Sequence, residues 1–190
     1  PVILTITNPL SNQFTLPLSL AGSDTDKCWG FTGTYLYKAD VTTIISGNGN
    51  YSISGLPTVL SDPNNDADGA SLLVIYRDTL VTSWNGEIIV LDGPRVARGG
   101  LATGFYFPST QLPCNSTLTR QGIQLSDIQS WPVLLGFPGT PMTLSPSMWN
   151  LVDTIVTPLS MGPISFNFSA SFNNQECCSF VFAYTYVRST

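Results

Sequence analysis

Residues 164–172 read Ile-Ser-Phe-Asn-Phe-Ser-Ala-Ser-Phe, an unbroken alternation of apolar and small polar side chains. Successive side chains of a β-strand point to opposite faces of its sheet, so this period of two predicts a strand with one buried face. Residues 179–187 follow after Asn173-Asn174 and are again rich in aromatic and β-branched side chains. We therefore expect the two segments to form a C-terminal hairpin.

The same signals recur throughout the chain before this hairpin. We expect strands at residues 2–7, 14–20, 31–37, 41–45, 51–54, 71–76 and 87–91. Pro17 has no N–H to donate to a ladder, so its strand should lie at a sheet edge or be irregular. Gly47-Asn48-Gly49-Asn50 is a turn cluster. Trp84-Asn85-Gly86 contains the Asn-Gly pair that favours a hairpin turn between the last two of these strands.

Helix signals are nearly absent, because 14 prolines and 16 glycines interrupt the 190-residue chain. The best helical candidate is residues 125–131, one or two turns at most. Residues 94–148 combine Pro, Gly and aromatic islands, and we expect long loops there with one or two short strands. About eight to ten strands at short spacing predict one all-β domain over residues 1–190: an antiparallel β-sandwich, jelly-roll-like, with long loops.

The charge composition narrows the classes of partner. Only 10% of the residues are charged, against about 25% in typical proteins. With seven Lys and Arg and a net charge of -5, no basic patch can form, so we expect no nucleic-acid partner. No window approaches the roughly 20 apolar residues of a membrane helix, so we expect no membrane insertion.

Catalytic patterns are weak. The chain has no histidine, which removes Ser-His-Asp and Cys-His catalysis and every His-containing metal site. Glu87 lies beside the predicted hairpin turn and Glu176 beside a cysteine pair, and we interpret both as surface residues. We therefore predict that the chain is not an enzyme and has no cofactor, calcium apart.

Four cysteines are disulfide candidates: Cys28, Cys114, Cys177 and Cys178. The even number fits an oxidising compartment, while free buried cysteines remain the alternative. A bridge between the neighbours Cys177 and Cys178 would be strained, so Cys28 and Cys114 should each pair with one of them. Adjacent side chains on a strand point to opposite faces, so one of the two could bond to a loop or to another subunit.

Two kinds of modification or ligand site are candidates. Oxygen-bearing side chains repeat every second residue in residues 62–69, which predicts a calcium site at Asp62, Asn64, Asp66 and Asp68. A solvated turn is the alternative, because the same residue types favour turns. Asp24 and Asp26 are a weaker calcium candidate. Asn-x-Ser/Thr triplets make Asn50, Asn115 and Asn167 glycosylation candidates.

One pattern resembles a family. Ala39-Asp40-Val41-Thr42, Gly49-Asn50-Tyr51-Ser52-Ile53, residues 68–76 (Asp-Gly-Ala-Ser-Leu-Leu-Val-Ile-Tyr) and Asp92-Gly93 follow one another in that order. This order is similar to that of β-sandwich modules of secreted bacterial and archaeal surface proteins, which are largely uncharacterised families. The resemblance covers residues 35–95 well and 145–190 weakly. It implies an extracellular location and a jelly-roll-like sandwich, and it supplies no catalytic residues.

These observations favour a structural subunit that assembles with copies of itself into an extracellular filament, appendage or surface layer. Residues 1–20 are a candidate strand-exchange tail, since an extended segment can add to a neighbour's sheet edge. The side chains that would enter the neighbour are Val2, Ile3, Leu4, Ile6, Phe14, Leu16 and Leu18. An ordinary strand within the chain is the alternative. Disulfides could reinforce the contact.

The alternative function is a secreted carbohydrate-binding or adhesive module that presents Trp or Tyr faces to glycans. A viral capsid jelly roll is a third reading, against which the lack of a basic arm counts. The chain begins Pro-Val-Ile-Leu without methionine, and we expect a secreted or cell-surface protein whose signal has been removed.

Overall fold

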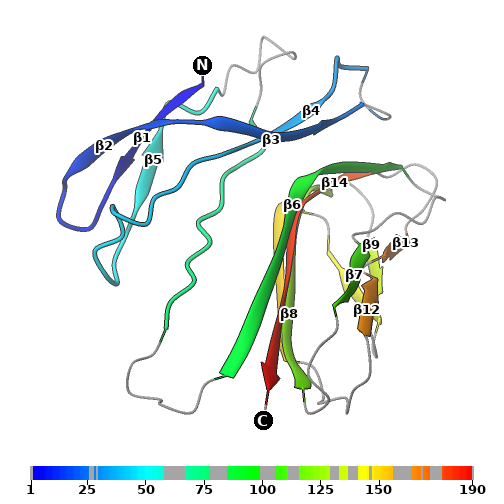
Figure 1. Ribbon diagram of the computed structural model, residues 1–190. Helices are drawn as coiled ribbons and strands as arrows, with labels where there is room; N and C mark the ends of the chain where they lie inside the picture. The colour runs from blue at the N-terminus through cyan, green and yellow to red at the C-terminus, as the bar shows by residue number, and fades with distance from the viewer. Residues whose placement is uncertain are drawn as a thin grey trace.

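The computed structural model describes residues 2–25, 28, 30–57, 67–77, 85–98, 106–110, 116–128, 133–136, 141–145, 147–155, 164–167, 169–171 and 177–189 (Figure 1). The regular elements within them are strands: Ile3–Thr7 (β1), Gln13–Pro17 (β2), Ser19–Asp24 (β3), Thr34–Lys38 (β4), Ser52–Ser54 (β5), Asn85–Arg98 (β6), Tyr106–Thr110 (β7), Ser116–Ile128 (β8), Val133–Gly136 (β9), Pro141–Leu144 (β10), Ser147–Ile155 (β11), Ile164–Asn167 (β12), Ser169–Ser171 (β13) and Cys177–Ser189 (β14). The expected all-β class is confirmed, and the strand pairs are antiparallel. No helix in this part of the chain could span a membrane.

The N-terminal sheet has the order β2-β1-β5. Alternate residues of β1 and β2 face one side, where Leu4, Ile6 and Leu16 form a buried cluster with Ile44. Pro17 is the last residue of β2, and within the part of the chain that the structure places, β2 pairs with β1 alone. The edge position predicted from Pro17 is therefore confirmed, and so are the strands predicted near residues 2–7, 31–37 and 51–54.

The strand expected at residues 41–45 is wrong, because these residues form a tight turn. The N–H groups of Ile44 and Ile45 both donate to the carbonyl oxygen of Val41, at 2.8 and 3.2 Å. Asp40 favours the turn, since its carboxylate accepts hydrogen bonds from the Thr42 N–H (2.9 Å) and hydroxyl (2.6 Å). Such local side-chain bonds compete with a sheet ladder. They also hold the pKa of Asp40 below its usual value.

The largest sheet has the order β11-β8-β14-β6, and its strands are long (Figure 1). Its central strand β8 lies within the region expected to be loops, so that expectation is wrong for residues 116–128. Leu125–Ile128 also belongs to β8, where the one helical candidate was placed. Residues 121–128 are all buried, including two glutamines, a serine and an aspartate. Because β8 is buried on both faces and contains polar residues, its sequence shows neither an alternation of apolar and polar residues nor a continuous apolar run. The sequence patterns that predict strands were therefore absent.

The C-terminal hairpin is also wrong in its pairing. β12 pairs with β7 and β13 pairs with β9, whereas β14 lies between β6 and β8. Asn173-Asn174 lies outside the described residues. Alternation identified the strands at both ends of this region, but it carries no information about which partner each strand meets.

A hairpin of β3 and β4 joins the N-terminal sheet to the large sheet (Figure 1). The Val96 N–H on β6 donates to Asp24 Oδ2 on β3 at 2.9 Å. Lys38 on β4 forms an ion pair with Asp92 on β6 at 2.5 Å. The β3–β4 hairpin therefore contacts β6 along its Asp92–Arg98 half. Along Asn85–Leu91, β14 is the one strand of the described residues that pairs with β6.

The segment of residues 71–77, here named the 71–77 segment, was expected to contain a strand and does not. It is extended but belongs to no sheet of the described residues. Asn85 and Gly86, expected in a turn, are instead the first residues of β6, opposite Ser189 and Arg188. Trp84 lies outside the described residues.

Candidate functional site

One face of the large sheet, here named the outer face, collects the polar groups and the 71–77 segment. Register places Tyr184 of β14 opposite Gly122 of β8, and Gly122 opposite Asp153 of β11. Arg120 lies two residues along β8 from Gly122 and so points to the same face. The opposite, inner face carries the alternate residues, such as Ile123 and Ala183, which are fully buried.

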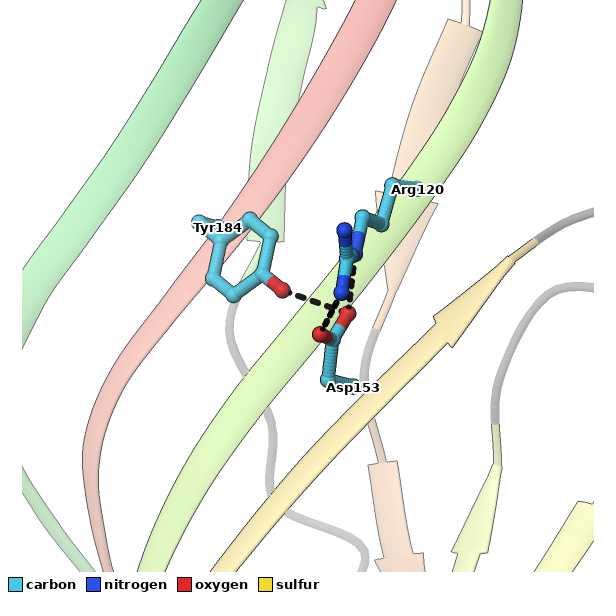
Figure 2. A network of polar contacts seen from close by, with 3 residues as sticks. All are labelled: Arg120, Asp153 and Tyr184. Atoms are coloured by element: carbon cyan, nitrogen blue, oxygen red, sulfur yellow. Dashed lines mark hydrogen bonds and ion pairs between the residues drawn. The ribbon is translucent and has the colours of Figure 1, made fainter. Parts of the chain in front are cut away.

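Arg120, Asp153 and Tyr184 form a hydrogen-bonded network on the outer face (Figure 2). Arg120 Nε and the Tyr184 hydroxyl both donate to Asp153 Oδ1, at 2.7 and 2.6 Å. Arg120 Nη2 contacts the other carboxylate oxygen, so the pairing is bidentate. One carboxylate thereby connects three strands.

The network changes the pKa of each of its members. The hydrogen bonds from Arg120 hold the pKa of Asp153 below its ordinary value, against the opposing effect of burial. The same pairing raises the pKa of Arg120. Burial, with the hydrogen bond to Asp153, raises the pKa of Tyr184 to about 12. At neutral pH the network is therefore an ionised pair with a protonated phenol.

Glycines make room for the two tyrosines of this face. A side chain at Gly122 would overlap ring atoms of Tyr184, so the ring passes close over Gly122 on its way to Asp153. A side chain at Gly86 would likewise lie 2.6 Å from Tyr186 Cε2. In each case a glycine on the neighbouring strand leaves space for a tyrosine of β14.

The chemistry of this network favours a structural role. The Asp153 carboxylate is occupied by Arg120 and Tyr184, which leaves it a poor base or nucleophile. The Arg120 side chain is 56% exposed and, with five N–H donors in a guanidinium group, still offers donors to solvent or to a partner. The site can therefore fasten strands and contact a polar partner.

Residues 68–71 are attached to the outer face. Trp149 Nε1 on β11 donates to Ser71 Oγ at 3.0 Å, and Ser71 Oγ donates to Gln124 Oε1 on β8 at 3.2 Å. Gly69 packs so closely on the Trp149 ring that a Cβ there would lie 2.8 Å from a ring carbon. The chain is thus fixed over β8 and β11 immediately before the 71–77 segment.

Beyond Ser71 the chain exposes a run of large apolar side chains. The side chains at positions 72 to 76 are between 41% and 84% exposed; they are Leu72, Leu73, Val74, Ile75 and Tyr76. Within the described part of the chain, residues 72–77 make no backbone hydrogen bond. As far as the described residues show, both the side chains and the backbone of this run are available to a partner.

A second exposed patch is aromatic. Tyr35 and Tyr37 lie two residues apart on β4, on one face of the strand, and are 51% and 40% exposed. Leu20, opposite Tyr37, and Phe31 are exposed nearby in the chain. Exposed rings on a strand can stack against a flat apolar partner.

The cysteine prediction is confirmed in part. Cys28 and Cys177 form a disulfide that closes a separation of 149 residues, with a Cα–Cα distance of 6.2 Å. This is one of the predicted pairings. Cys178 is fully buried beside it. Cys114 lies outside the described residues, so the second predicted pair stays a prediction.

Most of the predicted calcium and glycan sites stay predictions. Asp62, Asn64 and Asp66 lie outside the described residues. The Asp68 carboxylate accepts a long hydrogen bond from the Ser126 hydroxyl at 3.5 Å. No cluster of three metal-ligating side chains occurs among the residues that the structure places. Asp24, the weaker candidate, instead binds the Val96 N–H, and Asp26 is not described.

Of the glycosylation candidates, Asn50 is exposed in the loop before β5. Asn115 is not described, and Asn167 is the last residue of β12.

The predicted assembly strand lies inside the chain's own fold. β1 has β2 on one edge and β5 on the other, so both of its ladders are occupied. Leu4, Ile6 and Leu16 are buried there, Phe14 and Leu18 pack against the cluster, and Ile3 is exposed. The Val2 carbonyl accepts the Leu18 N–H at 2.9 Å. The N-terminal segment is thus not a free tail in this structure.

The sequence reasoning missed Arg120, Asp153 and Tyr184 because they are far apart in the chain and share no motif. The available signal was indirect: one charged residue, Arg120, and a glycine two residues later lie inside a region otherwise interpreted as loop. A glycine within a strand often marks the close approach of another group. Only the pairing of β14, β8 and β11 shows which group approaches.

Comparisons with known proteins add little. No protein-family model matches the chain, and no curated protein matches it. Among solved structures the chain is similar to the crystal structure of dimeric latent PorU from Porphyromonas gingivalis, with 10% identity and a TM-score of 0.38. The match covers 98% of this chain and 22% of that one. A likeness at that score carries no argument about function.

Proposed function

We propose that this chain is a structural subunit that assembles with copies of itself outside the cell. The observation that carries the proposal is the 71–77 segment, whose apolar side chains are exposed and whose residues 72–77 have no backbone hydrogen bond to any described residue. A folded protein that keeps such a run in solvent exposes an aggregation-prone surface unless a partner covers it. A second copy of the chain that covers this segment in a repeating contact would produce an ordered assembly.

The composition supports the proposal. Only 10% of the residues are charged, so copies of the chain repel one another weakly when they approach. The Cys28–Cys177 disulfide fits an oxidising compartment such as the cell exterior. Together these features favour an extracellular filament, appendage or surface layer.

Sedimentation velocity tests the proposal, with the purified protein over a wide concentration range and negative-stain electron microscopy of the same samples. We expect mass to rise with concentration and the images to show regular polymers or sheets. A single monomeric species at every concentration contradicts self-assembly. Amorphous particles without a repeat also contradict it, because they indicate aggregation without a defined contact.

The exposed aromatic patch on β4 favours a second candidate function, carbohydrate binding. Tyr35 and Tyr37 are about 6.6 Å apart along the strand at a rise of about 3.3 Å per residue, which would let one extended glycan contact both rings. A glycan array with the wild type and a Tyr35→Ala, Tyr37→Ala double variant tests it. Specific glycan binding that the double variant loses supports this function, and an array without signal rejects it.

A further inference from the structure

The open edge of β6 and the 71–77 segment are complementary halves of one contact. The edge along Glu87–Leu91 has no ladder partner within the described residues on the side away from β14. An edge strand directs N–H and C=O groups outward, and an extended segment with an unpaired backbone can satisfy them. The same chain carries both features, so copies of it can join one to the next.

We infer that residues 73–77 of one copy add as an antiparallel strand to the Glu87–Leu91 edge of β6 in a second copy. This inference rests on the self-assembly proposed above and names its contact. Because donor and acceptor are different surfaces, the contact is head-to-tail and generates a polymer or a closed ring.

Charge and apolar pattern together select one register. Arg77 opposite Glu87 joins a cation of the donor to an anion of the acceptor, and both side chains are exposed. Antiparallel pairing from that point sets Ile75 opposite Ile89 and Leu73 opposite Leu91. A slip of one residue would separate the charges and exchange the faces of every side chain.

The faces also agree in this register. Ile89 and Leu91 pair with Thr185 and Ala183, so they lie on the inner face of the sheet. Ile75 and Leu73 of the donor would extend that apolar face by one strand. Val74 and Tyr76 would lie on the outer face, opposite Val90 and Ile88.

The attachment of Ser71 prevents the same pairing within one chain. Ser71 is bonded over β8 and β11, and β14 separates β8 from β6. A strand beyond β6 would lie about 14 Å from β8, at a spacing of about 4.8 Å per strand. Two residues, from Ser71 to Leu73, span at most about 7 Å. While Ser71 stays attached, the segment therefore cannot reach the β6 edge of its own chain. It can still pair with the β6 edge of a second copy.

Charge reversal with mixing tests the contact in the full-length protein at low ionic strength. Arg77→Glu places two carboxylates together, and Glu87→Lys places two cations together. We expect each variant alone to assemble at a roughly tenfold higher concentration than the wild type. An equimolar mixture should assemble like the wild type, because each donor then meets an acceptor of opposite charge on the other chain.

A backbone variant gives an independent test. Ile75→Pro puts a residue without an N–H into the added strand, which disfavours ladder pairing, and in the monomer the Ile75 N–H donates to no described residue. We expect a folded monomer that does not assemble where the wild type does. Ile75→Thr keeps the N–H and is the matched control, which should still assemble. Circular dichroism and thermal melting establish that each variant is folded.

The outcomes separate this contact from the proposed function. A wild type that stays monomeric overturns both. Assembly that Arg77→Glu, Glu87→Lys and Ile75→Pro all leave unchanged overturns the strand addition and leaves self-assembly standing. The strand addition is also overturned if each single variant assembles more weakly and the mixture of Arg77→Glu with Glu87→Lys does not restore assembly. In that case the side chains at positions 77 and 87 do not meet between chains.

Discussion

Two glutamines of β8 show how the same residue type has opposite roles on the two faces of a strand. Gln124, on the outer face, accepts the Ser71 hydroxyl and donates to the Leu125 carbonyl at 3.0 Å. Gln121, on the inner face, is fully buried, and neither its Nε2 nor its Oε1 has a hydrogen-bond partner among the described residues. Thr185 lies directly opposite Gln121, and its hydroxyl likewise has no hydrogen-bond partner in the described part of the chain. Buried polar groups without partners cost stability.

We therefore predict that Gln121→Met raises the free energy of unfolding by about 1 to 3 kcal/mol, because it removes two unpaired polar atoms at similar volume. Gln124→Met is the matched control on the same strand. It should lower stability, since it breaks the hydrogen bonds of Gln124 to Ser71 and to the Leu125 carbonyl. Urea denaturation of both variants measures the difference. A loss of stability in Gln121→Met contradicts the prediction.

At the scale of elements, the strands of the large sheet are held together by side chains as well as by ladders. Tyr184 spans from β14 across Gly122 of β8 to Asp153 of β11 (Figure 2). Adding a side chain at position 122 would displace the ring, so the network depends on that glycine. Arg120 closes the network from β8.

The pKa shifts of this network predict its pH dependence. The pKa of Tyr184 is raised to about 12, so its stabilisation is complete below its ordinary pKa of 10.0 and is lost as the pH rises from 10 toward 12. The pKa of Asp153 is lowered, so its contribution is present above its ordinary value of 3.8 and is lost as the pH falls below it.

We expect Tyr184→Phe to lose about 0.5 to 1.5 kcal/mol at neutral pH and to show a smaller fall in melting temperature between pH 10 and 12 than the wild type. Tyr37→Phe, on the exposed face of β4, controls for the loss of a hydroxyl outside the network. Melting curves across this pH range make the comparison. If the alkaline fall of Tyr184→Phe equals that of the wild type, the network does not supply this pH dependence.

At the scale of the whole molecule, the Cys28–Cys177 disulfide and two polar contacts tie the N-terminal half to the large sheet. The disulfide joins the chain near β3 to the first residue of β14, while Asp24 and Lys38 contact β6. A crosslink that closes a long loop restricts the unfolded chain most strongly.

Reduction, or the double replacement of Cys28→Ser with Cys177→Ser, should therefore lower stability by about 2 to 5 kcal/mol. Thermal melting with and without reductant measures the effect, and the double variant should no longer respond to reductant through this bond. An unchanged melting temperature in the double variant would show that the disulfide does not hold the two parts together.

The sequence by itself determined the all-β class, the edge position of β2 and most of the N-terminal strands, because period-two alternation and the missing N–H of Pro17 are local properties. It also restricted the cysteine pairing to a few sets, one of which contains Cys28–Cys177. Low charge is also the sequence property that motivates the assembly proposal, which stays a prediction.

Only the tertiary structure decided the pairing of strands and therefore the sites. β8 has buried polar residues on both faces, so no pattern marked it, although it is the strand on which Arg120, Gly122 and Gln124 meet their partners. Residues 71–76 look like a strand in the sequence, but hydrogen bonds to Ser71 hold the chain over β8 and β11, away from the edge of β6. Pairing depends on contacts between residues far apart in the chain, which local periodicity does not encode.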